Sequence, residues 1–526
     1  MPQAPDCRHG TVLTRVEARI VATMTRAIRT LQTANEEPRD LEAITAALSQ
    51  RFTVVTGPAR SVRRARLDTF DHRLSAAGLV LLHQSGRDGD ELLLVDGETK
   101  LSEPIENLRW PSLADALPAG RVRERAAPVT GIRALIASSP ESRRLRRLDL
   151  LNEDGKTVAR VEVDEPGSPT AGPAQLTVRT LRGYDDQAQL AALILSAAGL
   201  RPLRRRAEGK PDSPPEPTIT DRRAPAALLL ATGLKGVLAT MRENLPGLLD
   251  DVDTEFLHNF RVAVRRTRST LKLGRSVLPP AVTARWEPAF KALGDLTTPV
   301  RDLDVYELDL PTMTGWLVAA APADLEPFAT FLRTRRAAAR EPLVRELRSA
   351  GFRRLLTQWG DELDRLTDGS SDPTPETLPA GRWAERSIAR AYRRVVRGGA
   401  AITIESPAED LHALRKRCKE LRYVIEVCGP VIARGPGKRA LAHLKDLQDV
   451  LGRFQDCEVQ STALHGFAEA MMADGVPASA LLAMGELIAH LEAEQARARR
   501  QFAGAFAHFS RPSTRQAMDK LGGTRR

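Results

Sequence analysis

Aromatic side chains are scarce in this sequence. Phe, Trp and Tyr together make up 4% of the chain, with only five Trp and four Tyr among 526 residues. Proteins that bind single-stranded nucleic acid usually stack the bases on aromatic side chains. The composition therefore disfavours RNA and single-stranded DNA as ligands, although nucleic acid stays open as an alternative partner.

Cysteines and long hydrophobic runs are also scarce. The four cysteines (Cys7, Cys418, Cys428 and Cys457) are too few and too far apart for a disulfide framework, which predicts a reducing compartment. They form no close cluster with histidines, so we expect no bound metal. No run of about 18 apolar residues occurs, and the N-terminal sequence MPQAPDCRHG has no apolar signal core. We expect a cytoplasmic protein that does not bind a membrane.

Signatures of catalysis are missing too. The sequence has no Walker A loop, no nucleophile elbow and no HExxH motif. We therefore expect no catalytic residues, no cofactor and no enzymatic activity.

The sequence does contain basic charge and clear domain boundaries. Lys and Arg number 78 against 67 Asp and Glu, a net charge of +11 whose placement matters more than its sum. Arg far outnumbers Lys, which is typical of GC-rich bacterial genomes. Five prolines in 204–225 indicate a linker, and a second Pro- and Ser-containing stretch lies at 367–379. We predict an N-terminal domain (1–203), a linker (204–220), a helical domain (221–511, with halves at about 221–366 and 380–511) and a basic tail (512–526).

Two different hydrophobic patterns predict two different folds. Before the linker, short runs at 52–56, 91–97 and 157–165 indicate strands, and segments around 15–32 and 187–198 indicate helices. After the linker, apolar residues recur at three- and four-residue spacing almost throughout. The fold class we expect is an α+β domain with an antiparallel sheet, followed by an all-α helical bundle.

The helical part contains a repeat with a spacing of 154 residues. LHNFRVAVRRTRSTLK (257–272) aligns with LHALRKRCKELRYVIE (411–426), and LGDLTTPVRDLDV (293–305) aligns with part of LKDLQDVLGRFQDCEV (444–459). The shared polar residues are His258, Arg261, Arg265 and Arg268 in the first copy and His412, Arg415, Lys419 and Arg422 in the second. The helical domain is thus predicted to be two copies of one unit. A capping box at 406–409 is expected to start the second helix.

Helical geometry places these residues on one strip. A helix turns about 100° per residue, so the four positions fall within an arc of about 80° beside the apolar face, and the strip is about 20 Å long. Lys272 extends the first strip, whereas Glu426 ends the second. Cations at the edge of a packed face suit phosphate groups, because arginine binds phosphate oxygens in a bidentate manner. The alternative is an ordinary solvated face, in which acids such as Asp302, Asp304, Asp456 and Glu458 neutralise the cations.

These duplicated motifs resemble the two halves of a CHAD domain (conserved histidine α-helical domain), and the resemblance covers nearly all of the chain after the linker. It implies a bundle of two pseudo-symmetric halves that binds inorganic polyphosphate on a basic surface and is not an enzyme. The phosphate contacts that it implies, together with further basic residues of the same helices and of a neighbouring one, are His258, Arg261, Arg265, Arg266, Arg268, Lys272, Arg393, Arg397, His412, Arg415, Lys416, Lys419 and Arg422.

The N-terminal region resembles a CYTH domain, the triphosphate-tunnel fold, at 64–81 (with LDTFDHRL) and at 146–165. Members of that family need a Glu-x-Glu-x-Lys strand, whereas VEARI at Val16 supplies one Glu and an Arg in a segment expected to be helical. LVLLHQ (79–84) stands where the family alternates Arg and Lys, and Arg160, Glu162 and Asp164 keep only part of an acidic row. We expect a degenerate domain without a Mg²⁺ site.

The hypothesis is therefore a cytoplasmic protein that binds inorganic polyphosphate and is targeted to polyphosphate granules. Two alternatives stay open: a nucleic-acid-binding protein that uses the same strips, and a CYTH-type triphosphatase or cyclase. Competition between DNA and polyphosphate separates the first alternative, and metal-dependent hydrolysis of a triphosphate separates the second. The sequence identifies no protein partner.

Overall fold

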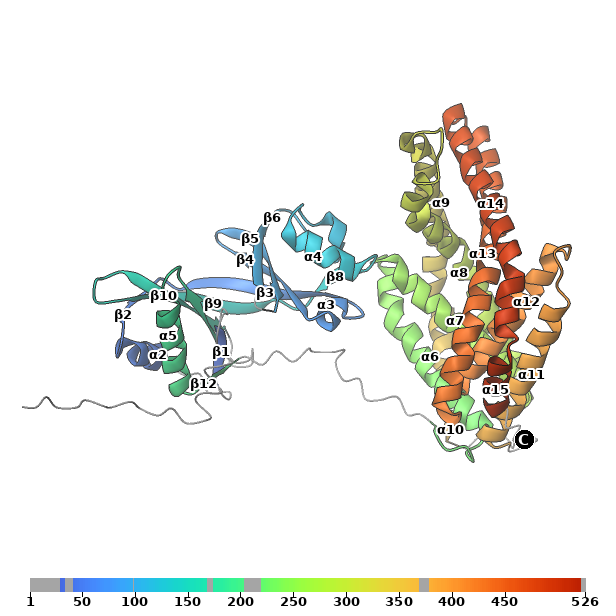
Figure 1. Cartoon of the computed structure of the whole chain (residues 1–526), viewed down its shortest axis with the longest axis horizontal. Helices are drawn as coiled ribbons and strands as arrows, with labels where there is room; N and C mark the ends of the chain where they lie inside the picture. Colours follow the sequence, from blue (N-terminus) through green and yellow to red (C-terminus); the bar gives the residue numbers. More distant parts are fainter. Residues whose placement is uncertain are drawn as a thin grey trace, which may run out of the picture. The chain divides into compact units, whose positions relative to one another are not determined.

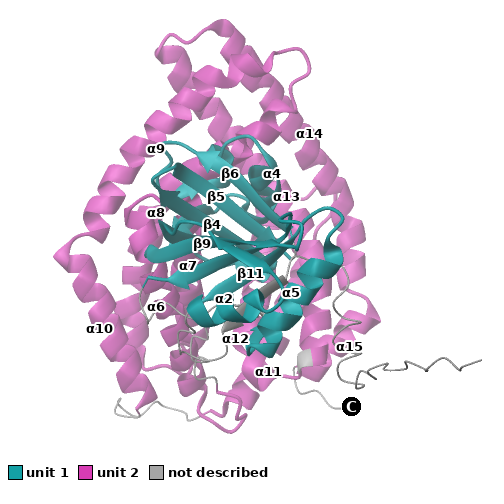
Figure 2. Cartoon of the chain, turned by 90° about the vertical axis from the view of Figure 1, so that its left-hand side faces the viewer, with its two compact units in different colours: residues 1–213 teal, residues 214–526 magenta. Residues whose placement is uncertain are grey.

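The computed structural model describes residues 29–33, 41–97, 99–167, 174–202, 219–368 and 378–521. The chain divides into two compact units, residues 1–213 and residues 214–526 (Figure 2). The VEARI segment and nearly all of the predicted linker lie outside the described residues.

The N-terminal unit is built on a 12-stranded antiparallel sheet (Figure 1). Its strands are β1 (Arg29–Thr33), β2 (Thr53–Thr56), β3 (Arg60–Thr69), β4 (Leu79–Gly86), β5 (Gly89–Asp96), β6 (Thr99–Ile105), β7 (Ser112–Leu113), β8 (Ala134–Ala137), β9 (Glu141–Leu151), β10 (Thr157–Pro166), β11 (Gln175–Thr180) and β12 (Leu200–Pro202). The main path runs β12-β1-β11-β10-β9-β3-β4-β5-β6, with β2 paired to β9 and β8 to β3 and β7. The helices are α2 (Leu41–Ser49), α3 (Arg73–Ala76), α4 (Arg121–Thr130) and α5 (Asp185–Ala197), with a 3-10 turn η1 (Ala114–Ala116).

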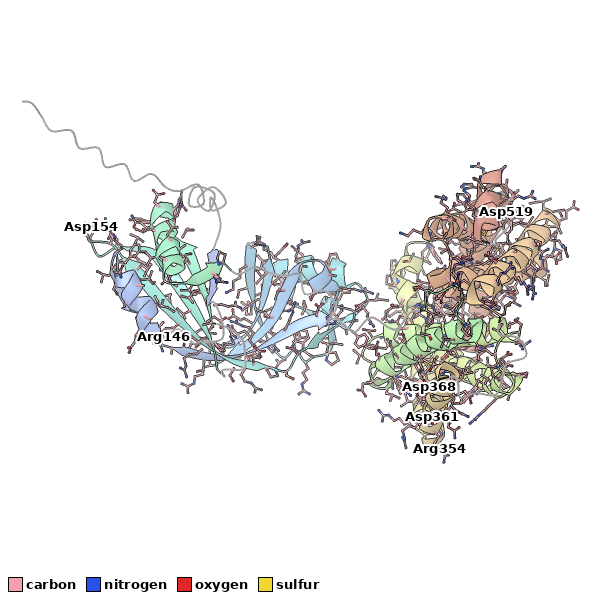
Figure 3. The ribbon with its side chains drawn as sticks, turned by 90° about the horizontal axis from the view of Figure 1, so that it is seen from below. Arg146, Asp154, Arg354, Asp361, Asp368 and Asp519 are labelled. Carbon is pink, nitrogen blue, oxygen red and sulfur yellow. The ribbon has the colours of Figure 1, made fainter. Side chains whose placement is uncertain are left out.

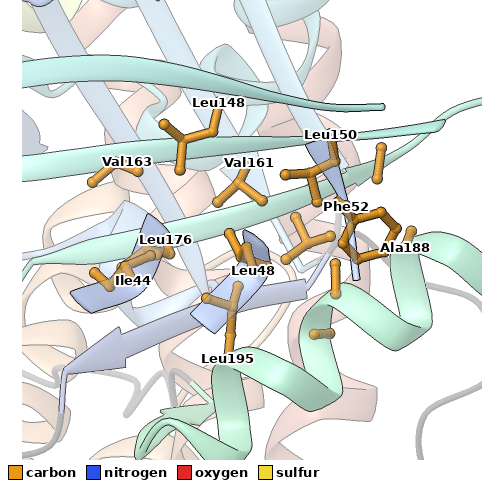
Figure 4. Close-up of a cluster of buried hydrophobic side chains, with 14 of the residues drawn as sticks. Ile44, Leu48, Phe52, Leu148, Leu150, Val161, Val163, Leu176, Ala188 and Leu195 are labelled. Carbon is orange, nitrogen blue, oxygen red and sulfur yellow. The ribbon is translucent and has the colours of Figure 1, made fainter. Parts of the chain in front are cut away.

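Alternation along the strands gives the sheet one apolar and one charged face. In β10, Val161 and Val163 are buried, while the charged residues beside them point to the other face. The apolar face packs against α2 and α5, where Leu48 and Leu195 are fully buried (Figure 4). A second apolar cluster, which includes Leu81, lies beside α3 and α4.

The strands predicted from the sequence are confirmed as β2, β5 and β10, and the helix predicted at 187–198 is confirmed as α5. The helix predicted at 15–32 is wrong at its end, because residues 29–33 form β1. This strand pairs with β11 on one side and β12 on the other, and these two ladders override the local helical pattern. Residues 15–28 lie outside the described part of the chain.

The C-terminal unit is helical. Its elements are α6 (Ala226–Leu249), α7 (Thr254–Gly274), α8 (Pro280–Thr314), η2 (Pro322–Leu325), α9 (Glu326–Leu347), α10 (Ala350–Thr367), α11 (Ala380–Ala400), α12 (Ala408–Val427), η3 (Gly429–Val431), α13 (Arg434–Ala473), α14 (Ala478–Phe509) and α15 (Pro512–Leu521). The predicted fold class, α+β with an antiparallel sheet and then all-α, is confirmed. Over the described residues, none of the helices has both the length and the apolar character to cross a membrane.

Neighbouring helices pack in sequence order. α6 packs on α7, α7 on α8 and α8 on α9, and in the same way α11 packs on α12, α12 on α13 and α13 on α14. The two groups meet where α7 contacts α12 and where α6 contacts α11. The starts of α6 and α11 are also joined, since the Ala226 N–H donates to the Leu378 carbonyl at 2.9 Å and the Ala380 N–H to the Ala224 carbonyl at 2.8 Å.

An aromatic cluster anchors α10 to α8. The rings of Trp286 and Trp359 have their centroids 4.9 Å apart, and Phe290 lies 5.3 Å from Trp359. Helix α10 is amphipathic, so its opposite side carries Arg354 and Asp361, which are exposed (Figure 3).

Two local predictions in this unit need revision. No capping box starts α12: its N-cap is Pro407, without a side-chain bond, because the Ser406 hydroxyl accepts the Thr403 N–H at 2.9 Å instead. Residues 512–521, predicted as part of a basic tail, form helix α15, which packs on α13 and α11 and buries Met518 and Leu521.

Candidate anion-binding site

The first predicted strip lies on α7. Asp253 caps this helix by accepting the Glu255 N–H at 3.0 Å, and Phe260 and Val264 pack into the core. This packing fixes the rotation of the helix and therefore the direction of the strip. Arg265, Arg266 and Lys272 are exposed, whereas His258, Arg261 and Arg268 are half-buried.

Arg261 is held against α8 by uncharged groups. Its Nη1 donates to the hydroxyls of Thr297 at 2.9 Å and Thr298 at 2.8 Å, and to the Gly294 carbonyl at 3.2 Å. Gly294 also gives room to Arg268, since a Cβ at this position would lie 2.9 Å from the Arg268 Nη1. The Arg261 guanidinium is thus positioned without an ion pair among the described residues.

Arg301 on α8 joins this cluster and was not among the residues predicted from the sequence. Its Nη1 is buried and has no hydrogen-bond partner. Burial lowers the pKa of His258, and the Arg301 charge lowers it further. The aligned residue in the second copy is Gln455, so a search for shared cations could not find Arg301. The only signal in the sequence was that Arg301 directly precedes Asp302 in the aligned segment 293–305.

The second strip lies on α12 and is partly neutralised. Arg415 Nη2 is 2.8 Å from Asp456 of α13, and Arg422 Nε is 2.6 Å from Glu426 of its own helix. His412 Nδ1 bonds to the Gln455 side chain. Lys416 is exposed. Among the described residues, no carboxylate forms an ion pair with Lys419.

The two strips approach each other at Arg265 and Lys419, where α7 packs on α12. Burial lowers the pKa of Lys419 to about 8, with smaller contributions from the charges of Arg415 and Arg265, while Asp456 opposes the shift. At this junction, cations from both strips therefore act on one partly buried lysine.

The basic residues predicted on α11 are less closely connected to the strips. Arg393 and Arg397 are exposed, and Arg393 Nε donates to its own helix at the Ala389 carbonyl, 3.3 Å away. The arginine of α11 that bonds to α12 is Arg394, whose Nη1 lies 2.8 Å from Glu420. Of these three arginines, Arg394 is the one that forms an ion pair with α12 among the described residues.

The acidic residues at aligned positions of the two copies, which include Asp302, Asp304 and Asp456, differ in their partners. Asp304 is fully buried and pairs with Arg336 of α9 at 2.6 Å, so it does not neutralise α7. Asp302 is exposed and acts on Arg261 only through its charge. Asp456 pairs directly with Arg415. The alternative of self-neutralised strips thus holds in part for α12, while over the described residues the α7 strip forms no ion pair.

The charged face of the N-terminal sheet is covered by its own ion pairs. Asp164 of β10 bonds to Arg64 of β3 and, at 2.7 Å, to Arg143 of β9. Glu162 lies 2.7 Å from Arg179 of β11 and 3.8 Å from Lys100 of β6. The partial acidic row seen in the sequence is therefore matched by cations. In the part of the chain that the structure describes, no group of three or more His, Cys, Asp or Glu could hold a metal ion.

One sequence family model spans both basic helices, α7 and α12. Residues 232–465 match the sequence model of the CHAD domain. The chain contains a CHAD domain. This match confirms the family that the duplicated motifs predicted and includes every residue of both strips. No curated protein shows significant sequence similarity to the chain.

Solved structures similar to the chain fall into two groups. The CHAD domain from the plant Ricinus communis is 21% identical, with a TM-score of 0.42, and the match covers 59% of this chain and 96% of that one. PptA from Streptomyces chartreusis is 18% identical, with a TM-score of 0.42, and the match covers 54% of this chain and 100% of that one. The second group includes HpAC1 from Hippeastrum, an adenylyl cyclase candidate described as having a dominant triphosphatase activity. It is 12% identical, with a TM-score of 0.25, and the match covers 34% of this chain and 90% of that one.

Proposed function

We propose that the CHAD domain binds inorganic polyphosphate and catalyses no reaction. The observation that supports this proposal is the junction of Arg265 and Lys419, two strip cations from different helices that approach each other without a carboxylate partner among the described residues. Like charges in a partly buried site repel each other, and a polyanion between them converts this repulsion into attraction.

The proposed ligand contacts extend from this junction along both strips. On the α7 strip the half-buried Arg261 and Arg268 lie before and after Arg265, and Arg301 adds a buried N–H donor without a partner. The full proposed set is His258, Arg261, Arg265, Arg266, Arg268, Lys272, Arg301, Arg393, Arg397, His412, Arg415, Lys416, Lys419 and Arg422. A strip of about 20 Å, from a rise of 1.5 Å per residue, suits a long repetitive anion.

Membership of the CHAD family supports a role related to polyphosphate in general. We attribute the two strips to an internal duplication, in which α6–α8 and α11–α13 are corresponding units whose strip residues recur 154 positions apart. The proposed domains are 1–203 (a degenerate CYTH-like domain), 221–511 (the CHAD domain) and the linker between them. The proposed location is the cytoplasm, at polyphosphate granules.

Calorimetric titration of the full chain with long-chain polyphosphate tests this function. We expect tight binding that weakens as salt rises, because each phosphate contact releases counterions. Duplex DNA at the same phosphate concentration should not displace the ligand, and free phosphate should not accumulate with or without Mg²⁺. Absence of binding, or easy displacement by DNA, would contradict polyphosphate recognition; hydrolysis would contradict a purely binding role.

A further inference from the structure

The two basic strips differ in how far their own acids neutralise them. Among the described residues, the α7 strip forms no ion pair with a carboxylate, whereas on α12 both arginines of the strip, Arg415 and Arg422, are paired. The four aligned positions carry similar cations in both strips, but the next position is Lys272 on α7 and Glu426 on α12. The asymmetry therefore comes from this difference and from the neighbouring helices.

For Arg261 and Arg415, the residues of the neighbouring helix explain the difference. Arg261 bonds to the hydroxyls of Thr297 and Thr298 on α8. The aligned positions on α13 are Leu451 and Gly452, which have no hydroxyl. Arg415 passes over Gly452, whose Cβ position lies 3.9 Å from its Nη2, and reaches Asp456 instead.

We propose that Asp456 and Glu426 compete with the ligand for the α12 cations, so that a polyanion binds the α7 strip and Lys419 first and reaches the rest of α12 only by displacing these carboxylates. This inference rests on the proposed binding of polyphosphate. Asp456 is 63% exposed, so water can solvate its carboxylate when the carboxylate leaves Arg415. Each pair has one more exposed partner, Asp456 at 63% and Arg422 at 52%, so a multivalent anion that offers several phosphates at once can displace the carboxylates.

Competition of this kind affects long chains and not short ones. A short anion such as tripolyphosphate is accommodated at Arg265 and Lys419 and leaves the paired arginines untouched. A long chain gains from Arg415 and Arg422 only after it has displaced Asp456 and Glu426. The two carboxylates therefore set the length above which the second strip contributes to affinity.

The test compares wild-type protein with the double variant Asp456→Asn/Glu426→Gln in titrations at low salt. We expect the double variant to bind long-chain polyphosphate more tightly, by about fivefold for each carboxylate removed, because both a competing ion pair and a repelling charge are lost. Tripolyphosphate affinity should change by less than about twofold. Asp456→Glu, which keeps the charge, should bind as the wild type does.

A matched control is available on α10. Asp364 is also 63% exposed and pairs with a lysine, Lys235, at 2.6 Å, so Asp364→Asn removes one negative charge outside both strips and matches the single variant Asp456→Asn. The inference is overturned if the single variant Asp456→Asn binds long chains no more tightly than Asp364→Asn, or if tripolyphosphate gains as much as the long chain in the double variant. If the wild type does not bind but the double variant does, the carboxylates are competitors; if neither binds, both the inference and the proposed function are wrong.

Discussion

At the scale of single residues, Lys419 links ligand binding to pH. Its pKa in the free protein is about 8, and bound phosphates should raise it because negative charge favours the ammonium form. Below pH 8 both states are protonated and affinity is constant. Above pH 8 the complex holds a proton that the free protein has lost, so affinity should fall as pH rises, by at most tenfold per pH unit.

Titrations at several pH values between 7 and 10 check this prediction. Lys419→Arg is the control, because a guanidinium stays charged over the whole range and its affinity should not follow the same curve. A wild-type curve as flat as that of Lys419→Arg would show that Lys419 does not contact the ligand.

At the scale of helices, the contact between α6 and α7 fixes the direction of the first strip. Gly247 of α6 packs directly on Phe256, since a Cβ there would lie 2.4 Å from the aromatic ring. Gly247→Ala should therefore lower the free energy of unfolding by about 1–3 kcal/mol through overpacking, measured by urea denaturation. Gly233 of the same helix has nothing within 4 Å of its Cβ position, so Gly233→Ala should raise it by up to about 1 kcal/mol. Equal effects of both substitutions would contradict the packing explanation.

The helices and strips were predictable from local patterns, but the helices and side chains that they contact were not. Periodicity and the 154-residue repeat located α7 and α12 and the residues of each strip. The junction of Arg265 with Lys419 depends on how two helices far apart in sequence pack, which no local pattern encodes. Arg301 was missed because its aligned residue is uncharged, and the pairing of Arg415 with Asp456 depends on Leu451 and Gly452 in a third helix.

The N-terminal sheet was predicted less completely. Alternation identified β10, whose valines are buried beneath α2 and α5. Strand β1 was mistaken for helix, because its pairing with β11 and β12 comes from segments more than 140 residues later in the sequence. The ion pairs of Glu162 and Asp164 likewise join strands β3, β6, β9 and β11, so the sequence showed the acids without their partners.

At the scale of the whole molecule, the question is whether a polyanion binds a defined site or a generally basic protein. A net charge of +11 attracts any polyanion to some extent. If the site determines binding, the position of a substituted charge matters; if the net charge does, only the number of charges matters. Arg265 on α7 and Arg354 on α10 are both exposed arginines without an ion pair among the described residues, so they form a matched pair.

The most direct measurement is the affinity of Arg265→Glu and Arg354→Glu for long-chain polyphosphate at two salt concentrations. Both variants have the same net charge. We predict that Arg265→Glu weakens binding at least tenfold, which corresponds to about 1.4 kcal/mol, and lowers the salt dependence by about one counterion, while Arg354→Glu binds nearly as the wild type does. Equal losses in the two variants would contradict a defined site at the junction of α7 and α12.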